Sequence, residues 1–265
     1  MSLPREQERP TASDAAARTL ILHMVVLHAL TSPPRDMLAQ MMGGWSQKDR
    51  DEFADEAKKR AEEAWERLGS VRAQMSPQER EFAGSTMLTM TQQQQVDGMW
   101  RMESLQVLIW ALGRLPKLPS FDTQADEGTL RSYAPEGAEA FLKEARLRPA
   151  EEIDRMRDAA ELWHWRSRTR QLVEMGDQLK PTPAMIASGL RTYDDIVRVA
   201  AEQAAKDGVA ATVDADFAVR GKPYRALTAE EWSEIRSITM ERHFALNWLC
   251  GYAPGNRWDD TPTDT

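Results

Sequence analysis

One stretch of the chain would be apolar on nearly every side if it formed a helix. Residues 105–112 read Leu-Gln-Val-Leu-Ile-Trp-Ala-Leu, and a helix with this sequence has almost no polar face to turn toward water. We therefore expect residues 92–112 to form the central, buried helix of the fold. Gly113 follows directly and is suited to cap the C-terminal end of that helix.

The other segments also carry helical patterns. Ser76-Pro77-Gln78-Glu79 and Thr228-Ala229-Glu230-Glu231 are capping boxes, in which side chains bond the free N–H groups of a new helix. Apolar residues recur at helical spacing in most of the remaining chain. Together these patterns predict an all-α, single-domain bundle of about seven to nine helices. Besides 92–112, the predicted helices cover 13–30 with Ser13 as the cap, 37–42, 46–68, a short stretch from 77, 149–175, 194–205 and 229–249.

Two regions depart from the helical pattern. Phe217-Ala218-Val219 and Tyr224-Arg225-Ala226 flank Gly221-Lys222-Pro223, which predicts a small β-hairpin near residues 216–227. Pro116, Pro119 and polar residues up to about Tyr133 predict an extended connection.

The two ends of the chain differ in character. Residues 1–12 are polar and contain proline, so we expect a flexible leader. The domain is then expected to cover residues 13–265, including a C-terminal tail in which Trp258 acts as an anchor.

Charge and cysteine content limit the classes of partner and compartment. The chain has 42 acidic and 34 basic residues, a net charge of -8. Nucleic acid and anionic membranes both require clustered basic residues, so we expect neither as a partner. Cys250 is the single cysteine, which fits a reducing cytoplasm. The hydrophobic stretch 19–30 is too short to span a membrane and is interpreted as a core helix.

Charged residues gather around tryptophans and supply the candidate functional residues. Arg242 falls within an apolar stripe of the last long helix, where a guanidinium requires carboxylate or carbonyl partners. His164 lies between Trp163 and Trp165. The candidate polar cluster consists of Arg101, Glu103, His164, Arg166, Arg242, His243, Asn247, Asp259, Asp260 and Asp264.

Two interpretations of this cluster remain open at the level of sequence. It could form a pocket with an arginine clamp for anions and a histidine for proton transfer. Alternatively, it forms a buried network of ion pairs and hydrogen bonds that fixes helix packing, and we favour this second interpretation. The acids of the C-terminal tail would then cap helices or pair with arginines such as Arg101 and Arg242.

Motifs for specific chemistry are missing from the sequence. The histidines show neither HxxxH nor HxxE spacing, so no metal site is expected. The sequence also contains no G-x-S-x-G motif, no P-loop and no dinucleotide fingerprint, and no cofactor is expected.

Five motifs follow one another in fixed order. They are Trp100-Arg101-x-Glu103 leading into Leu108–Gly113 and Leu115-Pro116, then Leu147–Ile153, Leu162-x-His164-Trp165, Glu241–Leu249, and Trp258–Thr265. This ordered set resembles the bacterial domain-of-unknown-function family 4272. The resemblance extends from about the first helix to the last residue. It implies a helical, cytosolic, single-domain protein and carries no activity with it.

Three functions are compatible with the sequence, in order of preference. The first is a protein-binding or regulatory module. The second is a small hydrolase or transferase that acts on an anionic small molecule, with Arg101, Arg166 or Arg242 as the anion clamp and His164 or His243 as acid and base. The third is a homo-oligomeric scaffold.

Overall fold

The computed structural model describes residues 8–128 and 137–263. Their contacts gather in two compact units. Of the described residues, unit 1 comprises 8–118, 125–128, 137–153 and 244–262, and unit 2 comprises 119–124, 154–243 and Thr263. The two units are described separately below, and the single domain over residues 13–265 stays a prediction.

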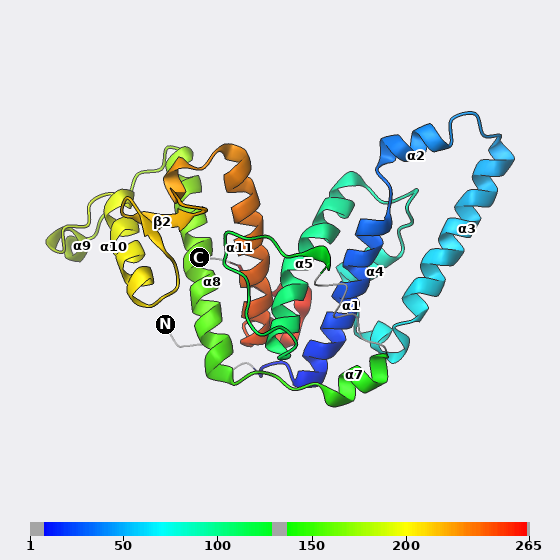
Figure 1. The fold of residues 1–265 in the computed structure, drawn as a ribbon, viewed down its shortest axis with the longest axis horizontal. Coiled ribbons are helices and arrows are strands. Elements are labelled where there is room, and N and C mark those ends of the chain that lie inside the picture. Colours follow the sequence, from blue (N-terminus) through cyan, green and yellow to red (C-terminus); the bar gives the residue numbers. More distant parts are fainter. Residues whose placement is uncertain (1–7, 129–136, 264–265) are drawn as a thin grey trace. The chain divides into compact units, whose positions relative to one another are not determined.

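Unit 1 is built on helices α1 (Ala12–Thr31) and α5 (Gln92–Ala111), which lie side by side (Figure 1). Residues 102–112 of α5 and the turn after it are all buried, as their apolar sequence predicts. Gly98 permits a close approach, because a Cβ atom there would lie 2.9 Å from both Ala29 Cβ and Phe82 Cζ. The N-terminal cap of α1 is Thr11, in a capping box with Asp14, and not Ser13 as predicted.

Shorter elements complete unit 1. Trp65, Leu68 and Val71 pack into one core cluster with Ile21 and Val25 of α1. The remaining elements of unit 1 are α2 (Arg35–Met41), α3 (Gln47–Glu66), η1 (Gly69–Gln74), α4 (Pro77–Ala83), α7 (Ala138–Glu144), η3 (Pro254–Asn256) and η4 (Trp258–Asp260), with η denoting a 3-10 helix.

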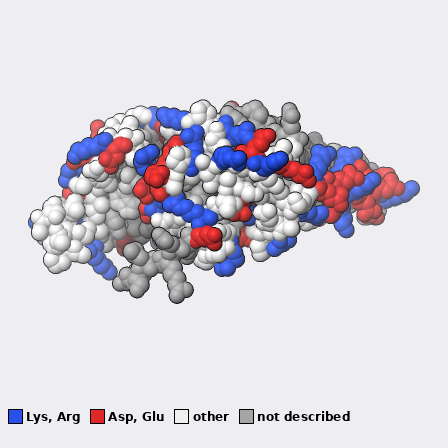
Figure 2. Space-filling model, turned by 90° about the horizontal axis from the view of Figure 1, so that it is seen from below, with Lys and Arg blue, Asp and Glu red and all other residues white. Residues whose placement is uncertain are grey.

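Helix α3 is the most exposed of the long helices in unit 1. Only Ala57 and Trp65 are buried among its 20 residues. Acidic and basic side chains alternate over its surface, as the densely coloured end at the right of Figure 2 shows. Ion pairs four residues apart, such as Arg60 with Glu56, join some of these charges. Exposed pairs of this kind contribute little to stability, so this face is a solvated one.

Unit 2 combines helices with a small sheet. Helix α8 (Ala150–Glu174) contributes its residues from Asp154, and α11 (Ala229–Leu249) contributes its residues up to His243. The indole of Trp232 on α11 donates to Ser167 Oγ on α8 at 3.2 Å. The other elements are α9 (Pro183–Ala187), α10 (Tyr193–Lys206), β1 (Thr212–Val213), β2 (Asp216–Val219), β3 (Lys222–Pro223) and η2 (Tyr224–Ala226).

The sheet is antiparallel in the order β1-β2-β3. Each turn has two residues with positive φ, Asp214 and Ala215 before β2 and Arg220 and Gly221 after it. Two such residues match the twist of a tight hairpin. Because the second turn is so short, Val219 pairs with Lys222. The hairpin near 216–227 is therefore confirmed, but residues 224–226 form a 3-10 helix and not its second strand.

The predicted all-α class is confirmed, with this sheet as the exception. Helices α7 and α9 lie within segments for which no helix was predicted. Residues 1–7 of the predicted leader and 129–133 of the predicted connection lie outside the described residues. In the described part of the chain, no single helix has both the length and the hydropathy of a membrane span; α1 and α2 reach them only as a pair, bent by 52°.

Candidate functional site

The structure divides the predicted polar cluster between the two units. His164, Arg166, Arg242 and His243 belong to unit 2. Arg101, Glu103, Asn247, Asp259 and Asp260 belong to unit 1. Asp264 lies outside the described residues.

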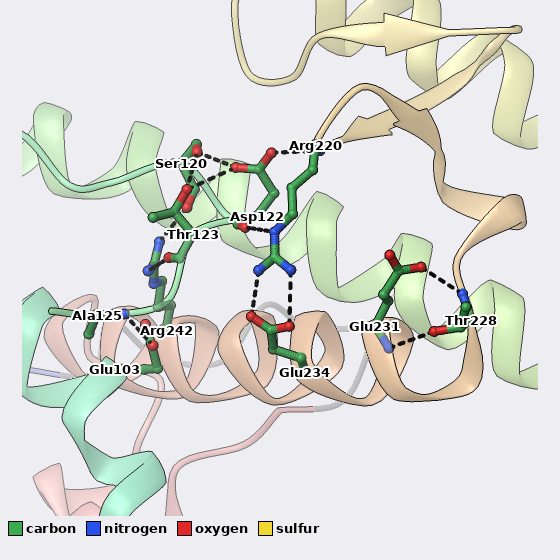
Figure 3. A network of polar contacts seen from close by, with 10 residues as sticks. All are labelled: Glu103, Ser120, Asp122, Thr123, Ala125, Arg220, Thr228, Glu231, Glu234 and Arg242. Carbon is green, nitrogen blue, oxygen red and sulfur yellow. Dashed lines mark hydrogen bonds and ion pairs between the residues drawn. The ribbon is translucent and has the colours of Figure 1, made fainter.

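Arg242 binds the loop 119–124 through backbone carbonyl groups. Its Nη1 donates to the carbonyl oxygen of Pro119 at 2.9 Å. Nη1 also donates to the carbonyl oxygen of Ser120 at 3.1 Å, and Nη2 donates to that of Thr123 at 2.7 Å (Figure 3). The guanidinium also lies 5.5 Å from the ring centre of Phe121. Arg242 is fully buried. These contacts use its donors to hold a loop in place.

A second arginine fastens the same loop to α11, and the sequence analysis missed it. The backbone N–H of Arg220 donates to Asp122 Oδ2 at 3.0 Å, and its Nε donates to the carbonyl oxygen of Asp122 at 2.9 Å. The remaining guanidinium nitrogens bind both carboxylate oxygens of Glu234 (Figure 3). Burial favours the neutral acid, but bonds from Ser120 and Arg220 hold the pKa of Asp122 below its usual value.

Arg166 forms a bidentate ion pair with Asp216, a residue that was not among the sequence-based candidates. Nε and Nη2 donate to the two carboxylate oxygens at 2.7 and 2.8 Å. Asp216 also accepts from the backbone N–H groups of Phe217 and Arg225. Burial alone would raise the pKa of Asp216, but Arg166 and these N–H groups hold it below the usual value. The pair fixes β2 against α8.

The two histidines of the cluster contact each other. Their Nδ1 atoms are 3.3 Å apart, and their rings meet edge to face. His243 is fully buried, and its Nε2 has no hydrogen-bond partner within the described residues. Burial, together with the charges of His164 and Arg157, lowers the pKa of His243 to about 3. His243 is therefore neutral at physiological pH and poorly suited to exchange protons there.

Two of the unit 1 candidates also serve packing. Glu103 is fully buried, and its Oε1 accepts the backbone N–H of Ala125 at 2.7 Å (Figure 3). Asn247 donates to the carbonyl oxygen of Pro262 at 2.8 Å, which holds the C-terminal tail against α11. Both contacts fix a loop to a buried helix.

Arg101 and Asp259 instead line an open pocket in unit 1. The pocket has a volume of about 180 Å³. Its apolar wall comes from α1 and α4, and its polar rim comes from α4, α5 and η4. The lining residues are Leu22, Val25, Gln78, Glu79, Glu81, Phe82, Gln94, Asp97, Gly98, Arg101, Trp258 and Asp259.

Trp258 and Asp259 bring the C-terminal tail to this pocket. Trp258 is buried and packs edge to face against Phe244 and Trp248. Asp259 Oδ2 accepts the backbone N–H of Gln78 at 3.0 Å and so caps the first turn of α4. Asp260 pairs with the neighbouring Arg257. Of the tail acids in the described residues, Asp259 is thus the one that reaches the pocket.

A buried carboxylate lies in the wall of the pocket. Glu79 is 6% exposed, and its Oε2 accepts from Arg18 and from the backbone N–H of Ser76. The guanidinium of Arg18 also lies 5.2 Å from the ring centre of Trp258. Within the described residues, Glu79 Oε1 is buried without a hydrogen-bond partner.

The sequence signal for Glu79 was its place in a capping box, which the structure confirms with Ser76. Its ion pair with Arg18 joins residues 61 positions apart, and no local pattern indicates such a contact. Asp97 and Glu81 carry no sequence signal either, because exposed acids on helices are ordinary.

The lining limits the chemistry that the pocket can perform. Among the residues that the structure describes, it offers carboxylates, two glutamine amides, one guanidinium and apolar side chains, but no hydroxyl, thiol or imidazole. These groups can bind and orient a polar group by charge and hydrogen bonds. They do not supply an activated nucleophile of the Ser-His or Cys-His type.

Comparison with protein families identifies the family of the chain. The family model described as Domain of unknown function (DUF4272) matches residues 2–186. No curated protein and no solved structure matches the chain. The match agrees with the resemblance noted from the sequence motifs. The motifs at 241–249 and 258–265 lie outside the matched range.

Proposed function

The chain belongs to the DUF4272 family, and we propose that it is a protein-binding module whose pocket in unit 1 takes up one side chain of a partner protein. The observation that carries the proposal is the pocket itself, with its small volume, its apolar wall and its charged rim.

The size of the pocket favours a side chain over a complete small-molecule substrate. Sites for small molecules usually have about 300–1,000 Å³, whereas this pocket has about 180 Å³. That volume accommodates a few heavy atoms, as one projecting side chain provides. Recognition of a protein through one inserted anchor is common, because such an anchor is fully desolvated when bound.

The positions of the candidate catalytic residues argue against the hydrolase or transferase alternative. Arg166 and Arg242 donate to Asp216 and to backbone carbonyls, respectively. His243 is buried, with its pKa lowered to about 3. An enzyme would need these groups available to a substrate in one pocket.

Capture of partners by two tryptophan variants tests the proposal. Gln78→Trp adds an indole at the exposed rim of the pocket, and Gln40→Trp makes the same change on the exposed face of α2, outside the pocket. After cross-linking in cells of the source organism, we expect at least one protein that the wild type and Gln40→Trp capture equally and Gln78→Trp does not. If Gln78→Trp captures the same proteins in the same amounts, the pocket is not a protein-binding site. Equal melting temperatures of the variants confirm that they are folded.

A further inference from the structure

The charge of the pocket is strongly unbalanced. Of the described residues, four carboxylates line it, those of Glu79, Glu81, Asp97 and Asp259, against the single guanidinium of Arg101. Arg18 offsets only the charge of Glu79, with which it is paired. A pocket with this lining attracts cations and repels anions.

We propose that the side chain received by this pocket is positively charged, an arginine or a lysine of the partner. The inference rests on the proposed function and adds the chemistry of the ligand. The cluster of acids alone would not carry it, since exposed acids are usually solvated. Two further observations point to a bound cation.

The first is the unsatisfied oxygen of Glu79. This residue lines the pocket and is 6% exposed, yet its Oε1 has no hydrogen-bond partner in the described parts of the chain. A buried carboxylate oxygen without a donor is unfavourable, because it has lost its hydration without replacement. An ammonium or guanidinium group brings several N–H donors, so it can satisfy this oxygen once the Glu79 side chain turns it toward the pocket.

The second is the division of the pocket into an apolar wall and a polar rim. Leu22, Val25 and Phe82 form apolar surface beside the carboxylates. Lysine and arginine have long aliphatic stems that lie along apolar surface while the charged head reaches polar groups. An aspartate or glutamate has a shorter stem and would meet carboxylates of its own sign.

The rim carboxylates retain acceptor capacity for such a head group. Asp97 Oδ1 accepts from Gln93 at 2.7 Å, and Asp259 Oδ2 accepts from the backbone N–H of Gln78. Each carboxylate has about four acceptor positions, so one internal bond leaves room for a ligand. Hydrogen bonds between ionised groups are stronger than neutral ones.

Binding of four capped amino acids to the full chain tests the inference. The probes are the N-acetyl amides of arginine, lysine, glutamine and glutamate, and the dissociation constant Kd is measured by calorimetry or by NMR titration. For single side chains we expect a Kd of about 1 mM for arginine or lysine. The glutamine probe should bind about tenfold more weakly, since it lacks the charge, and the glutamate probe more weakly still.

A pair of charge-neutralising variants links this preference to the pocket. Asp97→Asn removes one carboxylate of the rim, and Asp55→Asn makes the same change on the exposed face of α3. We expect Asp97→Asn to weaken binding of the arginine probe by about three- to tenfold, and Asp55→Asn to leave it unchanged. Raising the salt concentration should weaken binding of the arginine and lysine probes and leave binding of the glutamine probe unaffected.

The outcomes separate this inference from the proposed function. Equal or tighter binding of the glutamine or glutamate probe at the pocket overturns the cation preference and leaves a protein-binding pocket in place. Lack of binding by all four probes at about 10 mM, ten times the expected Kd, also overturns it. The capture experiment with Gln78→Trp then decides the proposed function by itself, because it does not depend on the charge of the ligand.

Discussion

Replacing Arg242 with methionine removes a guanidinium from unit 2 and leaves an unbranched apolar side chain of similar length. The change deletes the hydrogen bonds of 2.9, 3.1 and 2.7 Å to the carbonyl oxygens of Pro119, Ser120 and Thr123. It also deletes the contact of the guanidinium with the ring of Phe121. The loop would then be fastened to α11 mainly through Arg220.

The expected loss follows from the exposure of the acceptors. Ser120 and Thr123 are exposed residues, so water can replace the guanidinium at part of the loop. Each lost bond then costs about 1 kcal/mol, less than the roughly 1.5–3 kcal/mol of a bond to a charged group without such replacement, and the three together cost about 3 kcal/mol. For a chain of this size that corresponds to a melting temperature lower by roughly 6–12 °C.

Urea unfolding followed by circular dichroism measures this loss. Arg236→Met is the matched control, because Arg236 lies on the same helix and is exposed. We expect the control to change the free energy of unfolding by less than about 0.5 kcal/mol. If Arg242→Met is no more destabilising than Arg236→Met, Arg242 does not hold the fold together. Arg242→Met should also leave the Kd of the arginine probe unchanged.

Three further variants or titrations test the packing of each unit. Asp216→Asn should destabilise unit 2 by about 3 kcal/mol, because it leaves the buried Arg166 without its charged partner. Since the folded-state pKa of Asp216 is lowered, its stabilisation is present above the unfolded pKa near 3.9 and is lost as the pH falls further. The stability of Asp216→Asn should accordingly vary less with pH in that range. His243, with its pKa lowered to about 3, should show no NMR titration between about pH 5 and 8. Between about pH 6.5 and 3 the unfolded state takes up the proton first, so His243 reduces stability as the pH falls. Gly98→Ala should destabilise unit 1 by about 1 kcal/mol despite the higher helix propensity of alanine, because its Cβ would lie 2.9 Å from Phe82. Gly84→Ala, where the added Cβ would make ordinary contacts, should leave the stability unchanged.

Local signals predicted most of the secondary structure. The capping box at Thr228 marks the first residue of α11, and the apolar run of residues 105–112 is buried as expected. Both signals act over a few residues, so sequence alone reveals them. Helices α7 and α9 have 7 and 5 residues, and helices of one or two turns are too short for an apolar period to be recognised.

Partners distant in sequence could not be predicted. Arg166 and Asp216 are 50 positions apart, and Gln78 and Asp259 are 181 apart. The apolar stripe around Arg242 predicted a buried cation, and a buried cation needs hydrogen-bond partners. The carbonyl groups of the loop 119–124 could not be identified as these partners, because every residue carries a carbonyl group.

The residues that line the pocket were likewise only partly predictable from the sequence. Arg101 and Asp259 were selected as candidates for their charge beside tryptophans, and the structure brings both to one pocket. Glu79 and Asp97 were not selected, since a capping glutamate and an exposed aspartate have ordinary structural roles. What distinguishes Glu79 is an oxygen to which no described residue donates a hydrogen bond after α1, α4 and η4 have packed.

The most direct test of the account is a chemical-shift map of the full chain titrated with N-acetyl-arginine amide. If the pocket of unit 1 binds the ligand and the charges of unit 2 serve the fold, the largest shifts will fall on α4, on residues 94–101 of α5 and on the indole of Trp258. Largest shifts at His164, Arg166 and Arg242 would contradict the account, because they would place the ligand among the groups that we assign to packing.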